Sequence, residues 1–273
     1  MRTYTFNISL SILNHLGRNL YRSFITVLGE AISNSWDADA TNVSISIDRE
    51  QNTLIITDDG VGMDSESFQN KFLKIGYSKR KDNVTHTPKG RPFIGRKGIG
   101  KLALLSCAKK ITILTKTIDS DITGGVIENA GLDQAIIDDV SANDYILSIP
   151  EAERIDQYKA NLANSGTVII FEDITDGIKN KIEYIRKQVA YFFRFSILDP
   201  TFNISINNNP ITLDELNDVI QSTQFVWPIN ETNDALLTII EESDSLKKNK
   251  KLKISGINVT GFIATVERPS LLK

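Results

Sequence analysis

The sequence predicts a chain that mixes α-helices and β-strands, as in an α+β fold. Apolar residues recur at helical spacing from about Asn14 to Asp37, which indicates one long amphipathic helix. Apolar and polar residues then alternate over Val43–Ile47, and the apolar run Leu54–Thr57 follows, as expected for two neighbouring strands. Ser165–Phe171 is a further strand-like run. Helical and strand periods are therefore interleaved along one chain.

The other elements follow from the same two periodicities and from turn residues. In the first half of the chain we expect a short strand or arm at 3–10, a hairpin turn at Gln51–Asn52, a short helix at 64–74 and a strand at 110–115. Strands and turns with acidic loops follow at 120–150, and an amphipathic helix follows at 178–195. The last elements are a hairpin from Phe202 to Ile211 around Asn207–Pro210, a more polar stretch at 211–250 and strand-like alternation at 252–266.

Composition is that of an ordinary soluble globular protein. The 273 residues are 41% hydrophobic and 24% charged. A net charge of −3 gives no overall basic field that would draw the chain to nucleic acid. Cys107 is the only cysteine, which excludes an internal disulfide and favours a reducing compartment. With no apolar run of membrane-spanning length and no signal-peptide core at Met1–Phe6, we expect a cytoplasmic protein without a membrane partner.

The end of the first helix carries a stripe of oxygen-bearing side chains. At about 100° per residue, Glu30, Asn34 and Asp37 fall within roughly 60° of one another beside the apolar face. Carboxylate and carboxamide oxygens suit Mg²⁺, and a carboxylate can act as general base toward a nearby water. The alternative is an ordinary solvated helix face, because charged residues are mostly exposed.

A glycine-containing turn follows the second strand, in the run Asp58-Asp59-Gly60-Val61-Gly62-Met63. The two glycines allow a tight turn and a close approach of the backbone to a ligand. Asp58 sits at the strand end, where a buried carboxylate needs hydrogen-bond donors. An adenine amine would supply one, and a plain Asp-Gly turn is the alternative.

A polar loop and a second glycine motif come next. Residues 76–97 are expected to form a mobile lid with possible hinges at Gly76, Gly90 and Gly95, and disorder is the alternative. Its positive charges are Lys79, Arg80, Lys89, Arg91, Arg96 and Lys97. Gly95-x-x-Gly98-x-Gly100-Lys101 leads into a helix start, where backbone N–H groups can hold phosphate. The spacing fits neither a P-loop nor a dinucleotide fingerprint.

In this order and spacing, the three motifs resemble the GHKL ATPase superfamily over about residues 14–175. Its members include the gyrase B subunit, Hsp-ninety chaperones, histidine kinases and MutL, with the MORC proteins close by. The first motif is Glu30-x-x-x-Asn34-x-x-Asp37-Ala38, the second Asp58-x-Gly60-x-Gly62 and the third Gly95-x-x-Gly98-x-Gly100. The resemblance implies a Bergerat fold, a two-layer α/β sandwich whose mixed, mainly antiparallel sheet is backed by helices.

The resemblance also implies roles for individual residues, with ATP and Mg²⁺ as ligands. Glu30 would be the general base and Asn34 the Mg²⁺ ligand. Asp58 would bind the adenine amine, Met63 would line the adenine pocket, and the third motif would wrap the phosphates. The full set of implied nucleotide-binding residues is Asn34, Asp37, Asp58, Gly60, Gly62, Met63, Ser78, Lys79, Gly95, Gly98, Ile99, Gly100, Lys101 and Thr167.

The same resemblance sets the expected domains. Residues 1–210 would form the ATP-binding domain with an N-terminal arm. Residues 211–273 would form a connector and the first strands of a transducer-like domain. The strand-like end before Lys273 suggests the front piece of a longer protein. In hydrolysing relatives a lysine of the following domain reaches the γ-phosphate, and we expect that lysine to lie beyond these residues. Hydrolysis would then be slow in this piece alone.

Several functions are compatible with these motifs. We favour an ATP-gated switch that closes its lid, forms a homodimer and acts on DNA or a protein through regions beyond Lys273. The run Asp37–Thr41 favours DNA-linked or genome-defence work of the MutL or MORC type over chaperone-like protein remodelling. A nucleotide-sensing scaffold with negligible turnover is a further alternative. A histidine kinase is disfavoured, because His15 lies too close to the first motif and His86 lies in the expected lid.

Overall fold

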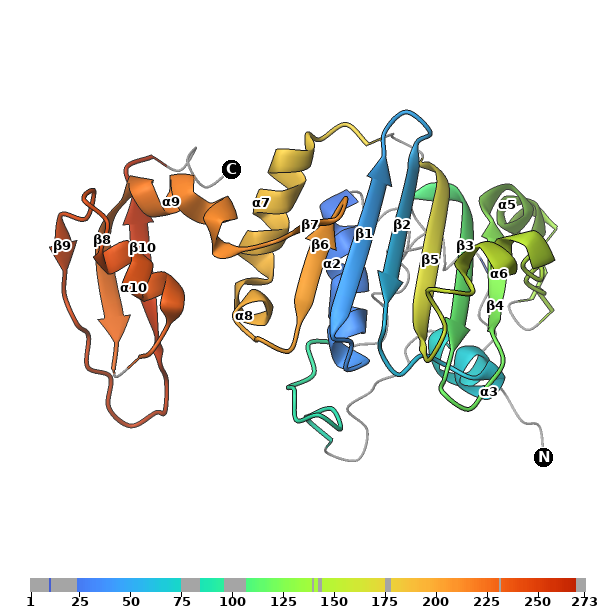
Figure 1. The fold of residues 1–273 in the computed structure, drawn as a ribbon, viewed down its shortest axis with the longest axis horizontal. Helices are drawn as coiled ribbons and strands as arrows, with labels where there is room; N and C mark the ends of the chain where they lie inside the picture. Colours follow the sequence, from blue (N-terminus) through green and yellow to red (C-terminus); the bar gives the residue numbers. More distant parts are fainter. Residues whose placement is uncertain are drawn as a thin grey trace, which may run out of the picture. The chain divides into compact units, whose positions relative to one another are not determined.

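A computed structural model gives the structure of residues 24–74, 84–95, 107–138, 144–174, 178–230 and 232–268, together with positions 10, 140 and 141. The chain divides into two compact units (Figure 1). The first comprises residues 1–181 and 200–210, and the second comprises residues 182–199 and 211–273. The expected division into an ATP-binding domain at 1–210 and a connector with transducer-like strands at 211–273 stays a prediction.

The first unit is built on a seven-stranded sheet with the order β4-β3-β5-β2-β1-β6-β7 (Figure 1). All neighbouring strands are antiparallel except β1 and β6, which are parallel. The predicted mixed, mainly antiparallel sheet is therefore confirmed. The strand bounds are β1 Asn42–Asp48, β2 Thr53–Asp58, β3 Ala108–Lys116, β4 Thr123–Glu128, β5 Gly166–Ile174, β6 Asn203–Ile206 and β7 Asn209–Pro210.

Alternation along the strands assigns side chains to the two faces of this sheet. On β1, Val43, Ile45 and Ile47 are buried whereas Ser44 and Ser46 are exposed. Helix α2, Phe24–Asp37, lies against one face of this sheet (Figure 1), and its apolar residues Val27, Leu28, Ala31 and Ile32 are buried. The described part of the first predicted helix is thus confirmed, and residues 14–23 lie outside the described residues.

The opposite face is covered locally by helix α6, Ala152–Tyr158. Tyr158 and Leu162 pack on Leu114 of β3 and on Val168 and Ile170 of β5. This cluster explains why the two central strands β3 and β5 are apolar on both sides, rather than alternating like β1.

Several helices depart from the sequence expectations. Residues 120–150 contain not only strand β4 but also helix α5, Asn129–Ile137, so the expectation of strands and turns is wrong there. Helix α5 buries only Asn129, Leu132 and Ala135, and short helices with so narrow an apolar stripe depend on tertiary packing rather than on propensity. The expected short helix at 64–74 consists of α3, Ser65–Ser67, followed by the π-turn η2, Phe68–Phe72.

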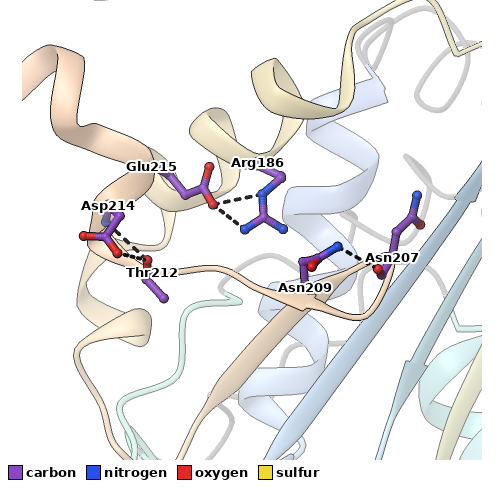
Figure 2. A network of polar contacts seen from close by, with 6 residues as sticks. All are labelled: Arg186, Asn207, Asn209, Thr212, Asp214 and Glu215. Carbon is purple, nitrogen blue, oxygen red and sulfur yellow. Dashed lines mark hydrogen bonds and ion pairs between the residues drawn. The ribbon is translucent and has the colours of Figure 1, made fainter.

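The predicted hairpin around Asn207–Pro210 is present between β6 and β7. Asn207 and Asn208 both adopt positive φ, at 48° and 64°, a conformation that asparagine tolerates better than most residues. The side-chain amide of Asn209 donates to the Asn207 carbonyl at 3.0 Å (Figure 2). The return strand begins at Asn209, two residues before the expected Ile211.

The second unit contains a three-stranded sheet with β8, Thr223–Ile229, at its centre. Strand β10, Gly261–Val266, pairs with it antiparallel, and β9, Lys248–Asn249, pairs with it parallel. The strand signal at 252–266 is therefore confirmed for its second half. We expected only a more polar stretch at 211–250, yet it holds β8, β9, η4 Leu213–Leu216, α9 Asn217–Ser222 and α10 Ala235–Glu241.

Polar contacts tie the helices of this unit together. The predicted helix at 178–195 is divided into α7, Ile182–Phe192, and α8, Arg194–Ile197. Arg186 of α7 donates through Nε to Glu215 Oε1 at 2.9 Å, and Thr212 caps η4 by accepting from the Asp214 N–H (Figure 2). Among the described residues of both units, no helix is long and apolar enough to cross a membrane.

Candidate functional site

The carboxylate of Asp58 is the centre of the site, because helix α2 and strand β2 meet there. Its Oδ2 accepts a hydrogen bond from Ser35 Oγ at 2.9 Å, and its Oδ1 accepts one from the Gly60 N–H at 3.0 Å. Only 9% of the residue is exposed. A buried carboxylate is tolerated when donors satisfy it, and these two donors hold both oxygens in a defined orientation at the end of the strand.

A row of threonines continues from Asp58 across the sheet. Asp58 is paired with Thr167 on β5, and Thr167 is paired with Thr115 on β3, so the three side chains point to the same face. Thr115 Oγ1 donates to the Gly166 carbonyl at 2.9 Å and accepts from the Met63 N–H at 2.9 Å. It lies 3.2 Å from Thr167 Oγ1. The structure therefore brings three predicted site residues, Asp58, Met63 and Thr167, to one place.

The glycines of the second motif are required by packing within the protein. Gly62 has φ of +64°, and a Cβ there would overlap the Lys116 carbonyl oxygen. A Cβ on Gly60 would lie 2.8 Å from the Ala38 carbonyl oxygen. Ser165 Oγ also donates to the Gly60 carbonyl at 2.7 Å. The expected close approach is thus an approach to neighbouring backbone, and contact of these glycines with a ligand stays a prediction.

Glu30 and Asn34 lie one turn apart on α2, and both are half-buried. Burial raises the pKa of the Glu30 carboxyl above its ordinary value, and the nearby carboxylate of Asp37 raises it further. A carboxylate with a raised pKa is a better proton acceptor than an ordinary one when it is ionised. Perturbed carboxyl groups of this kind also cluster at functional sites. Within the predicted stripe on this helix, Glu30 is therefore distinguished from an ordinary surface glutamate by its raised pKa.

Asp37 connects the first motif to the beginning of the third. Its Oδ1 accepts from the Ile94 N–H at 2.8 Å, and its Oδ2 accepts from the Gly95 N–H at 3.1 Å. Trp36 Nε1 donates to the Pro92 carbonyl at 2.9 Å. A Cβ on Gly95 would lie 2.7 Å from Asp37 Oδ2. Asp37 thus positions the glycine motif, and its direct contact with nucleotide stays a prediction.

The described part of the expected lid, residues 84–95, is fixed to the body of the first unit. Arg91 was expected to supply positive charge for phosphate, and this expectation is wrong. Its guanidinium is buried and donates to the Ala40 carbonyl at 2.6 Å and to Thr201. The Lys89 ammonium donates to the Asp39 carbonyl at 2.8 Å. The remaining predicted residues of the lid and glycine motif lie outside the described residues: Gly76, Ser78, Lys79, Arg80, Arg96, Lys97, Gly98, Ile99, Gly100 and Lys101.

Three residues of this site were not singled out from the sequence. Ser35 donates to Asp58 from helix α2, Thr115 of strand β3 accepts from the Met63 N–H, and Ser165 donates to the Gly60 carbonyl in the glycine turn. Ser35 could have been found from its helical position, because at helical spacing it falls on the apolar face of α2, between Ala31 and Ile32. Thr115 could not, because only the register of β3 against β5 places it beside Thr167.

The donor set fits a nucleotide with Mg²⁺. Asp58 provides an oriented carboxylate acceptor, and Thr115 and Thr167 provide hydroxyl groups on the same face. Within the described ranges, no group of three or more His, Cys, Asp or Glu side chains could hold a metal ion. Mg²⁺ usually takes one or two protein ligands, with substrate phosphates and waters completing its shell. A single carboxamide from Asn34 beside a triphosphate is consistent with that chemistry.

The chain is similar in sequence to several known proteins. The chain is 34% identical over 272 residues to HgiDII of Herpetosiphon aurantiacus, a candidate type II restriction enzyme. The matched region covers 98% of this chain and 42% of HgiDII. It is 26% identical over 243 residues to the chaperone protein HtpG of Oceanobacillus iheyensis, covering 84% of this chain and 36% of HtpG.

The DNA mismatch repair protein MutL of Ehrlichia chaffeensis is 24% identical over 166 residues, covering 60% of this chain and 21% of MutL. The chain therefore spans less than half the length of each of these relatives. The family model of histidine kinase-, DNA gyrase B- and HSP90-like ATPases matches residues 21–167. This range is more than half of the chain, and it contains Glu30, Asp58, Gly95 and Thr167. The chain belongs to the histidine kinase-, DNA gyrase B- and HSP90-like ATPase family, within the GHKL superfamily.

Proposed function

We propose that this chain binds ATP with Mg²⁺ and hydrolyses it. The observation that carries the proposal is the buried Asp58 carboxylate, held by Ser35 and Gly60 and aligned with Thr167 on one face of the sheet. A carboxylate fixed in this way can accept a hydrogen bond from the exocyclic amine of adenine. The test is release of ADP and phosphate from ATP in the presence of Mg²⁺, compared with the same reaction in EDTA.

In this proposal the residues of helix α2 act on the triphosphate end of ATP. Asn34 would supply the protein ligand of Mg²⁺, and the bound ion would reduce the negative charge of the phosphates. Glu30 lies one turn before Asn34, so its carboxylate can accept a proton from a water beside the phosphates. Asp37 holds the backbone at Ile94 and Gly95. The third motif, from Gly95 to Gly100, would then surround the phosphates.

Replacing Asn34 with Ala is expected to weaken binding of Mg-ATP and to remove the dependence of binding on Mg²⁺. The reason is that Asn34 is the proposed protein ligand of the metal, while Asp58 and its neighbours bind adenine independently. Calorimetric titration with a non-hydrolysable ATP analogue, with Mg²⁺ and with EDTA, measures both effects. Ser33→Ala is a matched control, because Ser33 Oγ only donates to the Gly29 carbonyl on the same helix. If Asn34→Ala binds Mg-ATP as tightly as the parent, the metal role is wrong.

We further propose that ATP operates a switch in which a lid closes over the nucleotide and two copies of the chain associate. The lid assignment is now confined to residues 76–83 and to 96 and 97, because residues 84–95 are anchored to helix α2. Limited proteolysis is expected to show protection of the lid by the ATP analogue but not by adenosine. Cleavage between residues 84 and 95 is expected to stay low in all samples. Equal cleavage of the lid with and without the analogue would contradict this.

The whole protein is proposed to act in a DNA-linked or genome-defence process. The support is the similarity to HgiDII, which extends over 98% of this chain, together with the similarity to MutL. The similarity to HtpG favours a second candidate, a protein-remodelling chaperone. A nucleotide sensor with negligible turnover is the third. Measuring ATP turnover with added duplex DNA, and separately with an unfolded client protein, distinguishes these roles. Stimulation by DNA alone is expected.

A further inference from the structure

Arg91 is a buried cation that joins three separate parts of the first unit. Only 5% of the residue is exposed. Nη1 donates to the Ala40 carbonyl at 2.6 Å, just after helix α2, and Nη2 donates to the Thr201 carbonyl and hydroxyl at 2.8 and 2.9 Å, just before strand β6. Its guanidinium carbon lies 4.8 Å from the ring centre of Trp36 and 5.2 Å from that of Phe202.

The segment that carries Arg91, residues 84–95, is folded back on itself and held at further points. The Thr87 N–H donates to the Arg91 carbonyl at 2.7 Å, and the Phe93 N–H donates to the Thr85 carbonyl at 3.0 Å. Thr87 Oγ1 donates to the Asp39 carboxylate. These contacts make the segment an anchored element rather than a free loop, and Thr87 and Arg91 are its two buried residues.

The anchored segment ends at the two backbone N–H groups that bind Asp37. Ile94 and Gly95 follow Arg91 by three and four residues, so a shift of Arg91 would be transmitted directly to them. Burying a cation is expensive compared with burying an apolar side chain of similar size. A planar guanidinium can bond two carbonyls while stacking on two rings, and a lysine cannot. The side-chain chemistry therefore suits alignment of neighbouring elements.

We propose that Arg91 is a positioning residue for the phosphate end of the nucleotide site. It fixes the Ile94 and Gly95 N–H groups relative to Asp37 and helix α2, so that the described start of the glycine motif is held in place before a triphosphate binds. This inference rests on the proposed ATP-binding function. It adds that the affinity for phosphate depends on a cation that does not itself reach the phosphates.

The test is Arg91→Lys, which keeps the charge but removes the planar guanidinium that donates to the Ala40 and Thr201 carbonyls. Affinities for a non-hydrolysable ATP analogue and for adenosine are measured by calorimetry and by ligand-detected NMR. We expect affinity for the analogue to fall about tenfold, the lower end of the loss seen when outer-shell partners of a metal site are removed. Affinity for adenosine is expected to stay unchanged, because the Asp58 pocket does not involve Arg91. A general loss of stability would instead lower the affinity for both the analogue and adenosine.

Amide hydrogen exchange provides a readout that is independent of nucleotide. Exchange at Ile94 and Gly95 is expected to speed up in nucleotide-free Arg91→Lys, since the donors to Asp37 lose their alignment. Arg49→Lys is the matched control, because Arg49 Nε also donates to a backbone carbonyl, that of Ile178 at 3.1 Å. Arg49 directly follows the last residue of strand β1, whereas the Ala40 carbonyl that binds Arg91 precedes the first residue of that strand. It should change neither the exchange at these amides nor the affinity for the analogue. If Arg91→Lys fails to fold, the milder Thr201→Val, which removes one of the Arg91 contacts, replaces it.

Three results would overturn the proposal. Unchanged affinity for the analogue, with a parent protein that binds it, would show that alignment by Arg91 is unnecessary, and the ATP-binding function would stand. An equal loss for the analogue and adenosine would make Arg91 a residue of general stability. If the parent protein binds neither ligand, the ATP-binding function itself is wrong, and this inference is wrong with it.

Discussion

Asp58→Asn is expected to abolish nucleotide binding while leaving the fold intact. The change is isosteric. The remaining side-chain oxygen can still accept from the Gly60 N–H, and the new amide can donate to Ser35 Oγ, which keeps its own bond to the Ala31 carbonyl. Toward adenine, however, the substitution places an N–H₂ donor against another donor. A buried donor left without an acceptor costs about 1–3 kcal/mol, and the acceptor that fixes the base is lost as well. Calorimetry with a non-hydrolysable ATP analogue measures the effect.

Asp48→Asn is the matched control for this experiment. Asp48 is also an aspartate at the end of a strand, and its Oδ1 accepts from the N–H groups of Glu50 and Gln51 in the β1–β2 turn. It lies at the opposite end of the hairpin from Asp58. Its substitution should leave affinity for the analogue unchanged. Unchanged affinity in Asp58→Asn would remove Asp58 from the site.

Glu30→Ala is expected to retain ATP binding and to lose hydrolysis. Glu30 shares one face of α2 with Asn34, so a metal-bound triphosphate beside Asn34 would bring the attacking water close to its carboxylate. Removing a general base typically lowers the rate about 10²–10⁴-fold. Contacts to adenine and to the phosphates lie elsewhere and would maintain the affinity. Steady-state turnover and analogue affinity are measured on protein that extends past Lys273, where the assisting lysine is expected.

The pH dependence of turnover gives a second readout for Glu30. A general base must be ionised, and the pKa of this carboxyl is raised above 4.5 by burial and by Asp37. Turnover should therefore fall on acidification at a higher pH than an ordinary glutamate would give. Glu50→Ala, on an exposed turn, is the control and should match the parent in rate and pH profile. If Glu30→Ala also matches the parent, Glu30 is a surface or metal-shell residue and the mechanism is wrong.

The sequence was most informative where local periodicity and ligand chemistry coincide. Strand β1 alternates clearly because only one of its sides is buried, and the apolar run of β2 leads directly to Asp58 at the strand end. The stripe from Glu30 to Asp37 follows from helical spacing alone. Family resemblance supplied the sheet architecture, which no single segment of the sequence encodes.

The contacts that depend on distant parts of the chain were not accessible from the sequence. Thr115 reaches the site only through the register of β3 and β5. Arg91, assigned to phosphate as one of several loop cations, is buried because Trp36, Phe202 and two carbonyls surround it. Helix α5 was missed because packing, rather than a strong apolar periodicity, stabilises it. In each case tertiary contacts decide the outcome, and they leave little trace in neighbouring residues.

Titration of the folded chain with a non-hydrolysable ATP analogue in the presence of Mg²⁺ tests the central claim most directly. The expected result is saturable binding at one site per chain, weakened by EDTA, lost in Asp58→Asn and kept in Asp48→Asn. Absence of binding by the folded parent chain, or equal binding by both aspartate variants, would contradict the claim that Asp58 is the centre of an ATP site.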